Sequence, residues 1–222
     1  MPAVPKTTKL PRTIRKREFT RGRLVAAAEQ LVAQRGLDAI SIDEITEAAD
    51  VAKGTFYTHF LDKSELAAAI ADSIRIDLEQ KVMMLNEGIS DAAVRMANGL
   101  STFFIFAIHQ PVRARALIRL NPGLVDPDLP INAGIRSDVS LGAETKRFWV
   151  SSVDAAVVAL LGISVAIVMR LTDPVHQVPE PYVFSSQSLA TALVALGLKQ
   201  SEALSMAKAA MASRRKELKK QE

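Results

Sequence analysis

Residues 52–63 carry polar side chains of the kinds that contact nucleic acid. Phosphate groups bind cations and hydroxyls, and base edges bind short polar groups. No acidic residue occurs between Ala52 and Leu61. Phe56 and Phe60 are four residues apart, so in a helix they share one face. The other faces are left to the polar set: Lys53, Gly54, Thr55, Tyr57, Thr58 and His59. The pattern predicts a short helix with a surface suited to DNA.

A second short helix is predicted just before this one. Ser41 and Glu44 have the spacing of a capping box, in which each side chain binds the other residue's backbone N–H. Asp50 follows at the turn, where Asp tolerates left-handed backbone. An apolar face runs along the helix through Ile42, Ile45, Ala48 and Ala49. Two helices joined by a tight turn form the helix-turn-helix pattern. The alternative is a helical hairpin whose outer face is only solvated.

The run AADVAKGTFYTHFLDK at residues 48–63 closely resembles the signature of the TetR (tetracycline repressor) family of bacterial transcription regulators, and the resemblance extends upstream through residues 23–49. Asp50 replaces the family's usual Gly, and Ala52 replaces a frequent Ser. The resemblance implies that Tyr57 and Lys63 contact phosphates and that Lys53 and Thr58 contact base edges. The full set that it places against DNA is Ser41, Lys53, Gly54, Thr55, Tyr57, Thr58, His59 and Lys63.

Composition excludes several other kinds of chemistry. The chain has 222 residues, is 49% hydrophobic and contains no cysteine, so it can bury a core without disulfides or thiolate metal sites. His59, His109 and His176 lie in separate segments, which argues against a metal site. The GISVA run at 162–166 lacks the last glycine of a nucleophile elbow, and no glycine-rich phosphate loop occurs. We therefore expect no enzyme activity and no cofactor.

Basic residues are concentrated near the start of the chain. Residues 1–23 carry eight Lys or Arg and only Glu18 as an acid, whereas the whole chain has a net charge of +4. We predict a flexible basic arm over residues 1–20 that lies along phosphates, or alternatively a solubilising tail. A helix from about Arg21 to Gly36 should then support the two short helices and complete a DNA-binding domain over 21–63.

Residues 64–222 are predicted to be all-helical, and no strand alternation appears anywhere, so the fold class is all-α. Proline-rich segments at 121–130 and 173–181 predict loops. The most apolar run, residues 155–169, extends ~22 Å as a helix, short of the ~30 Å hydrocarbon core of a bilayer. We predict a fully buried helix there. The helices are predicted at 62–86, 90–106, 111–120, 131–141, 151–171, 185–198 and 201–218.

By the resemblance, residues 64–222 bind a small molecule and form a homodimer, in which two long late helices pair across a two-fold axis. Helices 151–171 and 185–198 contain the small residues that allow such pairing, although both could be ordinary core helices. Five residues are candidates for the wall of a ligand pocket, and each could equally be ordinary core or surface: Phe103, Phe104, Arg119, Trp149 and Met169.

These patterns together predict a cytoplasmic bacterial regulator, associated with the nucleoid when bound to DNA and not with a membrane. It should bind a palindromic operator as a homodimer and be released by an unidentified small-molecule effector. One alternative is a helical small-molecule-binding or metabolic protein that does not bind DNA. Another is a DNA-binding regulator without a ligand response, which the sequence does not separate from the first.

Overall fold

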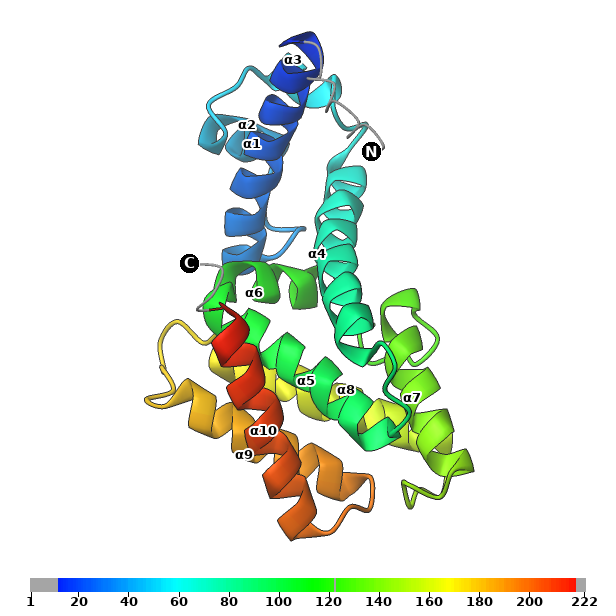
Figure 1. Ribbon diagram of the computed structural model, residues 1–222. Helices are drawn as coiled ribbons and strands as arrows, with labels where there is room; N and C mark the ends of the chain where they lie inside the picture. Colours follow the sequence, from blue (N-terminus) through cyan, green and yellow to red (C-terminus); the bar gives the residue numbers. More distant parts are fainter. Residues whose placement is uncertain (1–11, 122, 219–222) are drawn as a thin grey trace, which may run out of the picture.

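α4 (Lys63–Asn86) is the long helix that joins two groups of helices (Figure 1). The computed structural model describes residues 12–121 and 123–218, which are helical with connecting loops and contain no strand, so the predicted all-α class is confirmed. One group, the head, contains α1 (Arg12–Arg35), α2 (Ile42–Ala48) and α3 (Lys53–Tyr57). The other group, the body, contains α5 (Ala92–His109), α6 (Pro111–Leu120), η1 (Pro130–Asn132), α7 (Ala133–Glu144), α8 (Val153–Leu171), α9 (Pro181–Ala195) and α10 (Gln200–Leu218).

α2 and α4 begin where their capping residues predict. Ser41 Oγ accepts from the Glu44 backbone N–H at 3.1 Å, and Glu44 Oε2 accepts from the Ser41 N–H at 2.7 Å, so the predicted capping box is present. Asp62 caps α4 by accepting from the Glu65 N–H at 2.8 Å. Phe56 and Phe60 are buried in the same hydrophobic core as the apolar side of α1, and this core continues into the body.

α1 begins at Arg12 rather than near Arg21, so the predicted flexible arm is wrong for residues 12–20, and residues 1–11 lie outside the described part of the chain. The prediction placed the helix start at the first buried stripe, which does begin at Leu24. Upstream of it, Lys, Arg and Glu are good helix formers, and extending an existing helix costs less than starting one. The exposed first turns therefore continue the packed helix outward.

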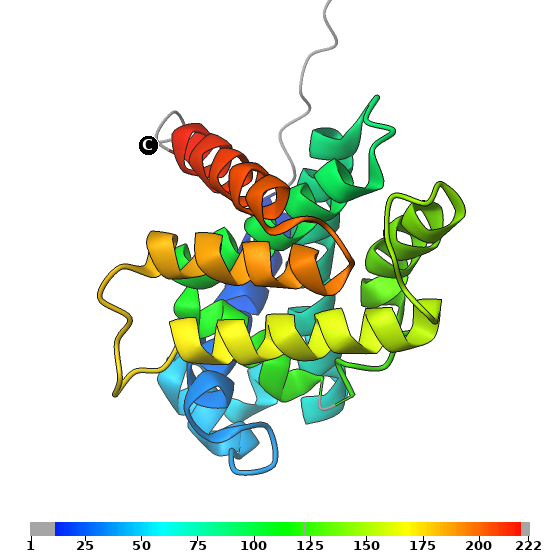
Figure 2. The same ribbon diagram turned by 90° about the horizontal axis from the view of Figure 1, so that it is seen from below.

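α5 is the central helix of the body. It packs against α4, α6, α7, α8, α9 and α10, and it buries side chains on most of its faces. A helix that is apolar nearly all round belongs inside a protein, which explains this position. Asp91 starts the helix by accepting from the Ala93 N–H at 2.7 Å. α8, α9 and α10 cover α5 on the side away from the head (Figure 2).

α8 is less buried than predicted. It is long and apolar enough to cross a membrane by composition, yet only 33% of its most apolar window is buried. One face packs into the body through Leu160, Leu161 and Val168, whereas Val158 and Met169 are exposed. α9 lies beside it and exposes Val183 and Val194 (Figure 2). The sequence shows that the helix is apolar. Composition alone does not show which of its faces are buried by other helices of this chain and which are left exposed.

The turn between α2 and α3 depends on Asp50, which has φ 49° in the left-handed region. Arg23 Nη2 on α1 donates to the Asp50 backbone oxygen at 3.2 Å and to its Oδ2 at 2.9 Å. Asp adopts this conformation more readily than most residues, because its short polar side chain can hydrogen-bond locally. Arg23 therefore fixes a turn that the family usually builds with Gly.

We expect Asp50→Ala to destabilise the protein by about 1–2 kcal/mol, because alanine has the full left-handed backbone cost and offers no carboxylate to Arg23. Asp50→Gly is the matched control, since glycine also lacks the carboxylate but adopts positive φ freely. It should unfold in urea close to the wild type. Equal losses in the two variants would contradict a backbone origin of the effect.

Candidate nucleic-acid interface and ligand cavity

α3 is held in the head by its aromatic residues. The rings of Phe56 and Phe60 lie with centroids 5.8 Å apart, and both side chains are buried. Tyr57 packs edge-on to Phe56 with centroids 5.4 Å apart but is 53% exposed. The two phenylalanines therefore anchor the helix, and the Tyr57 hydroxyl is left on the outer surface. This arrangement matches the predicted division of α3 into a packed face and a polar face.

The other polar residues in and just after α3 differ in their exposure and in whether their side chains already have partners. Gly54 is exposed, with open space where a Cβ would lie. Thr55 is half-buried, and its carbonyl accepts from Thr58 Oγ1 at 2.7 Å, so the Thr58 hydroxyl proton is engaged. Lys53 Nζ lies 2.8 Å from Asp43 Oδ1, and its hydrogen bond with this carboxylate raises the Lys53 pKa. Contact of Lys53 with a base edge would therefore require the ammonium to be shared with Asp43 or released from it.

Two residues of the predicted DNA-contacting set have roles inside the head. Lys63 Nζ donates to the backbone oxygens of Ile40 at 2.7 Å and Leu37 at 3.2 Å. It thereby ties the start of α4 to the loop before α2. Ser41 Oγ lies 2.9 Å from Glu44 Oε2 within the capping box. Contact of Ser41 and Lys63 with DNA stays a prediction. The capping box of Ser41 was predicted from the sequence, whereas the hydrogen bonds of Lys63 were not apparent from it.

The first turns of α1 add basic groups beside α3, which the sequence reasoning missed by treating them as an arm. Burial lowers the pKa of His59, and the nearby guanidinium groups of Arg17 and Arg21 lower it further. The Arg21 guanidinium carbon lies 4.9 Å from the centre of the Phe60 ring. Along the same turns the exposed cations are Arg12, Arg15, Lys16, Arg17 and Arg21. The repeat of basic residues every three to four positions was the available signal.

Three of the four acidic residues of α2 and the turn have a basic partner, and in the described residues only Glu47 has none. Asp43 pairs with Lys53, and Asp50 pairs with Arg23 at 2.9 Å. Glu44 pairs with Arg35 at 2.8 Å. The hydrogen bond from the Ser41 N–H, and to a lesser extent the one from Arg35, lowers the pKa of Glu44 to about 2. Pairing reduces the field that these carboxylates would direct at a phosphate backbone. The acidic composition of the head is therefore compatible with a polyanion on the α3 side.

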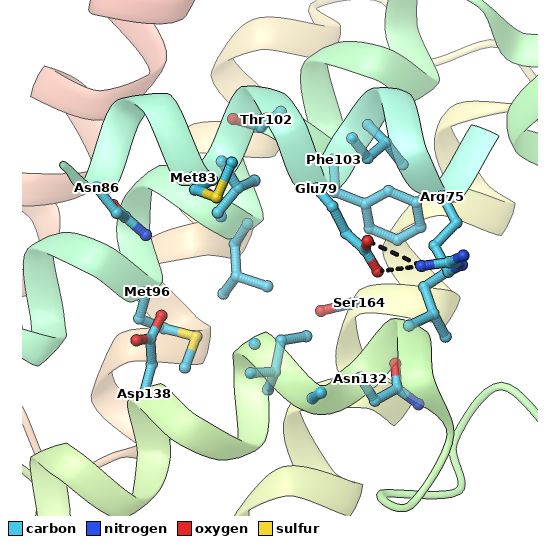
Figure 3. A pocket seen from close by; sticks show the side chains of 18 of the residues that line it. Arg75, Glu79, Met83, Asn86, Met96, Thr102, Phe103, Asn132, Asp138 and Ser164 are labelled. Carbon is cyan, nitrogen blue, oxygen red and sulfur yellow. Dashed lines mark hydrogen bonds and ion pairs between the residues drawn. The ribbon is translucent and has the colours of Figure 1, made fainter. Parts of the chain in front are cut away.

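The body contains a cavity of about 890 Å³ between α4, α5, α7 and α8 (Figure 3). Its wall is mainly apolar and includes Leu78, Val82, Met83, Met96, Leu100, Phe103, Leu117, Ile131, Ile135, Leu161 and Val165. Two ion pairs belong to the wall: Arg75 binds both oxygens of Glu79, and Arg95 Nε lies 2.6 Å from Asp138 Oδ1. This size and lining suit a small organic molecule. No group of three or more His, Asp or Glu in the described residues is arranged to hold a metal ion.

Phe103 alone of the five predicted pocket residues lines this cavity. Phe104, next to it, is fully buried and points into the core. Trp149 and Met169 are 84% and 59% exposed, and Arg119 is exposed on α6 close to Gly36 at the end of α1. Residue type suggested all five, but whether a side chain reaches a cavity depends on which helix face is turned inward. That Phe103 contacts a ligand stays a prediction.

Comparison with known proteins gives consistent results over both parts of the chain. The family "Bacterial regulatory proteins, tetR family" matches residues 24–70. The structure of RolR in complex with resorcinol is 27% identical, with a TM-score of 0.52 over 87% of this chain and 95% of that one. A γ-butyrolactone receptor, described as an ArpA-like protein, is 19% identical, with a TM-score of 0.67 over 89% and 98%. CprB from S. coelicolor A3(2), a TetR family protein, is 22% identical, with a TM-score of 0.63 over 89% and 98%.

We expect Tyr57→Ala to remain folded and to bind its DNA sites at least about tenfold more weakly, because the hydroxyl is exposed and one charge-assisted hydrogen bond to phosphate contributes ~1.5–3 kcal/mol. The sites are obtained by selecting genomic DNA fragments with the wild-type protein. Trp149→Ala is the control, since it also removes an exposed aromatic side chain but lies in the body. A folded Tyr57→Ala protein with wild-type affinity would contradict the assignment of this surface to DNA.

Proposed function

Since the chain belongs to the tetR family of bacterial regulatory proteins, we propose that it is a cytoplasmic, sequence-specific DNA-binding repressor that a small-molecule effector releases from its operator. One observation carries the proposal. α4 begins at Lys63, a few residues after α3 ends at Tyr57, and its later turns, from Arg75 to Asn86, line the cavity. A ligand in the cavity would thus press on the same helix that supports the head.

The DNA-binding part of the proposal is supported by the exposed polar face of α3 and the basic first turns of α1. Tyr57 is exposed, and Gly54 allows close approach of another backbone. Exposed cations on the first turns of α1 supply sequence-independent attraction to phosphates. In this proposal α3 reads base edges in the major groove, and α1 follows the adjacent phosphate backbone. Lys53 and Thr58 contact base edges in this proposal, and Tyr57 and Lys63 contact phosphates.

A homodimer is supported by the exposed apolar faces of α8 and α9. Val158 and Met169 on α8, with Val183 and Val194 on α9, are between 42% and 59% exposed and lie on adjacent helices. Exposed apolar patches of this kind usually mark protein interfaces. Pairing α8 and α9 with the same helices of a second copy would form a four-helix bundle about a two-fold axis. Two heads held in this way would read a palindrome with half-sites ~34–36 Å apart.

The effector part is supported by the cavity and by similar proteins whose names include ligands. RolR was crystallised with resorcinol, and another similar structure is a γ-butyrolactone receptor. Both ligands are small organic molecules, which agrees with a mainly apolar cavity of about 890 Å³. We propose that this chain responds to a small organic effector of its own.

α6 offers a second route from the cavity to the head. Leu117 on α6 lines the cavity, and Arg113 one turn earlier bridges two other helices. Arg113 Nε lies 3.3 Å from Glu29 Oε1 on α1, and its Nη2 lies 3.3 Å from Asp77 Oδ2 on α4. Burial raises the pKa of the Glu29 carboxyl, and Arg113 opposes that shift. Movement of α6 on ligand binding would therefore act on both helices that hold the head.

We expect Val158→Asp to convert the dimer into a monomer, because the apolar face would have to bury an unpaired carboxylate. Sedimentation velocity measures the mass, and operator affinity should fall with the loss of the second head. Leu204→Asp is the control, since Leu204 is an exposed apolar residue of α10 outside the proposed face. A wild-type protein that is monomeric on its operator would overturn the dimer and the palindrome together.

We expect Arg113→Gln to bind both operator and effector but to couple them at least threefold more weakly than the wild type, because α6 loses its links to α1 and α4. Coupling is the ratio of operator affinities with and without an effector found by screening compounds for DNA release. By linkage, DNA must weaken effector binding by the same ratio, which provides an independent measurement. Arg136→Gln is the matched control, since within the described residues Arg136 pairs only with Asp128 and Asp154, both in the body.

An effector that binds the wild-type protein without changing operator affinity would overturn the proposed mechanism. Equal coupling in Arg113→Gln and the wild type would instead remove α6 from the route and leave α4 as the connection. Unfolding curves of each variant, recorded without ligand, separate loss of coupling from loss of the fold.

A further inference from the structure

The uncharged polar side chains of the cavity wall mostly have partners within the protein. Thr102 Oγ1 donates to the Asn98 backbone oxygen at 2.8 Å. Asn86 Oδ1 accepts from Asn98 Nδ2 at 3.0 Å, and Asn132 Nδ2 donates to two backbone oxygens of the preceding loop at 2.7 and 2.8 Å. These groups shape the wall but already have hydrogen-bond partners, so they contribute little additional attraction for a ligand.

Ser164 on α8 is different. Its side chain is 2% exposed, its Oγ has no hydrogen-bond partner in the described structure, and it lines the cavity. Its hydroxyl is directed toward the space enclosed by the cavity side chains (Figure 3). A buried hydroxyl without a partner is costly, so the site favours any ligand atom that completes the hydrogen bond. A hydroxyl both donates and accepts, which suits a carbonyl or a hydroxyl oxygen.

Four of the five charged side chains of the wall are paired with one another, and the fifth, Glu87, is exposed next to the end of α4. Arg75 binds Glu79 Oε1 and Oε2 at 3.0 and 2.9 Å, and Arg95 binds Asp138 at 2.6 Å. Burial raises the pKa of Asp138, and the adjacent Arg95 opposes this. A charged ligand would have to be desolvated in this apolar cavity and would then compete with an existing ion pair for its counter-charge. The wall therefore disfavours both carboxylate and ammonium ligands.

We propose that the effector is a neutral, mainly apolar molecule with a hydroxyl or carbonyl oxygen that hydrogen-bonds to Ser164 Oγ. This inference rests on the proposed function, because it takes the cavity as the effector site. The apolar part of the ligand is buried against Leu100, Phe103 and Leu161, and the single oxygen fixes its position along α8. The ligand class follows from one buried hydroxyl without a partner in a mainly apolar cavity, whose other polar groups have partners apart from the exposed Glu87.

The test uses four probes of one chain length: decan-1-ol, decan-2-one, decanoate and decylammonium. Binding to the full-length protein is measured by calorimetry in the absence of DNA. We expect the alcohol and the ketone to bind, and the two ions to bind at least about tenfold more weakly. Ser164→Ala should weaken the alcohol and the ketone by about five- to tenfold, the effect of one hydrogen bond.

Ser185→Ala is the matched control. Ser185 Oγ is also buried without a partner in the described residues, but Ser185 lies on α9 and does not line the cavity. It should leave the affinities of all probes unchanged. Neither alanine variant should unfold at a lower temperature than the wild type, because each removes a hydroxyl that makes no hydrogen bond.

Three results would overturn this inference: tighter binding of decanoate or decylammonium than of the neutral probes, no binding of either neutral probe, or equal effects of the two serine variants. The proposed repressor function fails separately. A protein that binds neutral probes through Ser164 but releases no DNA with any effector would overturn that function and leave the ligand class intact. A charged effector that releases DNA would overturn the ligand class and leave the repressor function intact.

Discussion

The continuity of α4 is the constraint on which the rest of the molecule depends. The helix runs from Lys63 to Asn86 without a proline or a glycine, so it has no built-in hinge. Leu66 and Ile70 are buried close to the head end, and Val82 lines the cavity close to the other end. Bending such a helix breaks backbone hydrogen bonds, whereas tilting it leaves them intact. In the proposed mechanism, a displacement at the cavity would therefore be converted into rotation of the head.

Fixation of the head end makes this conversion effective. Lys63 holds two loop carbonyls before α2, and Arg23 fixes the turn after it, so α2 and α3 are attached both to α4 and to α1. In the proposed complex, phosphate and groove contacts depend on the spacing of two heads. A rigid head that moves as a unit loses several of these contacts together, whereas a loosely attached head could adjust and keep them.

The local chemistry of the head was predictable from the sequence because its signals are local. The Ser41–Glu44 capping box and the Phe56–Phe60 pair each lie within one helical turn, and both are present. Features that depend on distant segments were not predictable. α1 continues beyond its packed part to Arg12, Lys63 reaches back to Leu37 and Ile40, and Trp149, suggested by its type, is exposed. In each case the deciding partner lies far away in the sequence or is the solvent.

Ser164 shows the same limit for ligand recognition. In the sequence it is a serine inside an apolar run, and many such residues bond the carbonyl one turn earlier. Its lack of a partner and its place on the cavity wall appear only when α5 is packed against α8 and the cavity forms between these helices and α4.

α8 also exposes Val158 and Met169 on the face proposed for the dimer. In the proposed dimer, one helix would carry the effector's hydrogen bond on its inner side and the two-fold interface on its outer side. Because a helix moves as a rigid unit, an effector that shifts α8 would alter the dimer axis as well as α4. The ligand would then change the spacing of the two heads in two ways, through the tilt of α4 and through the dimer interface.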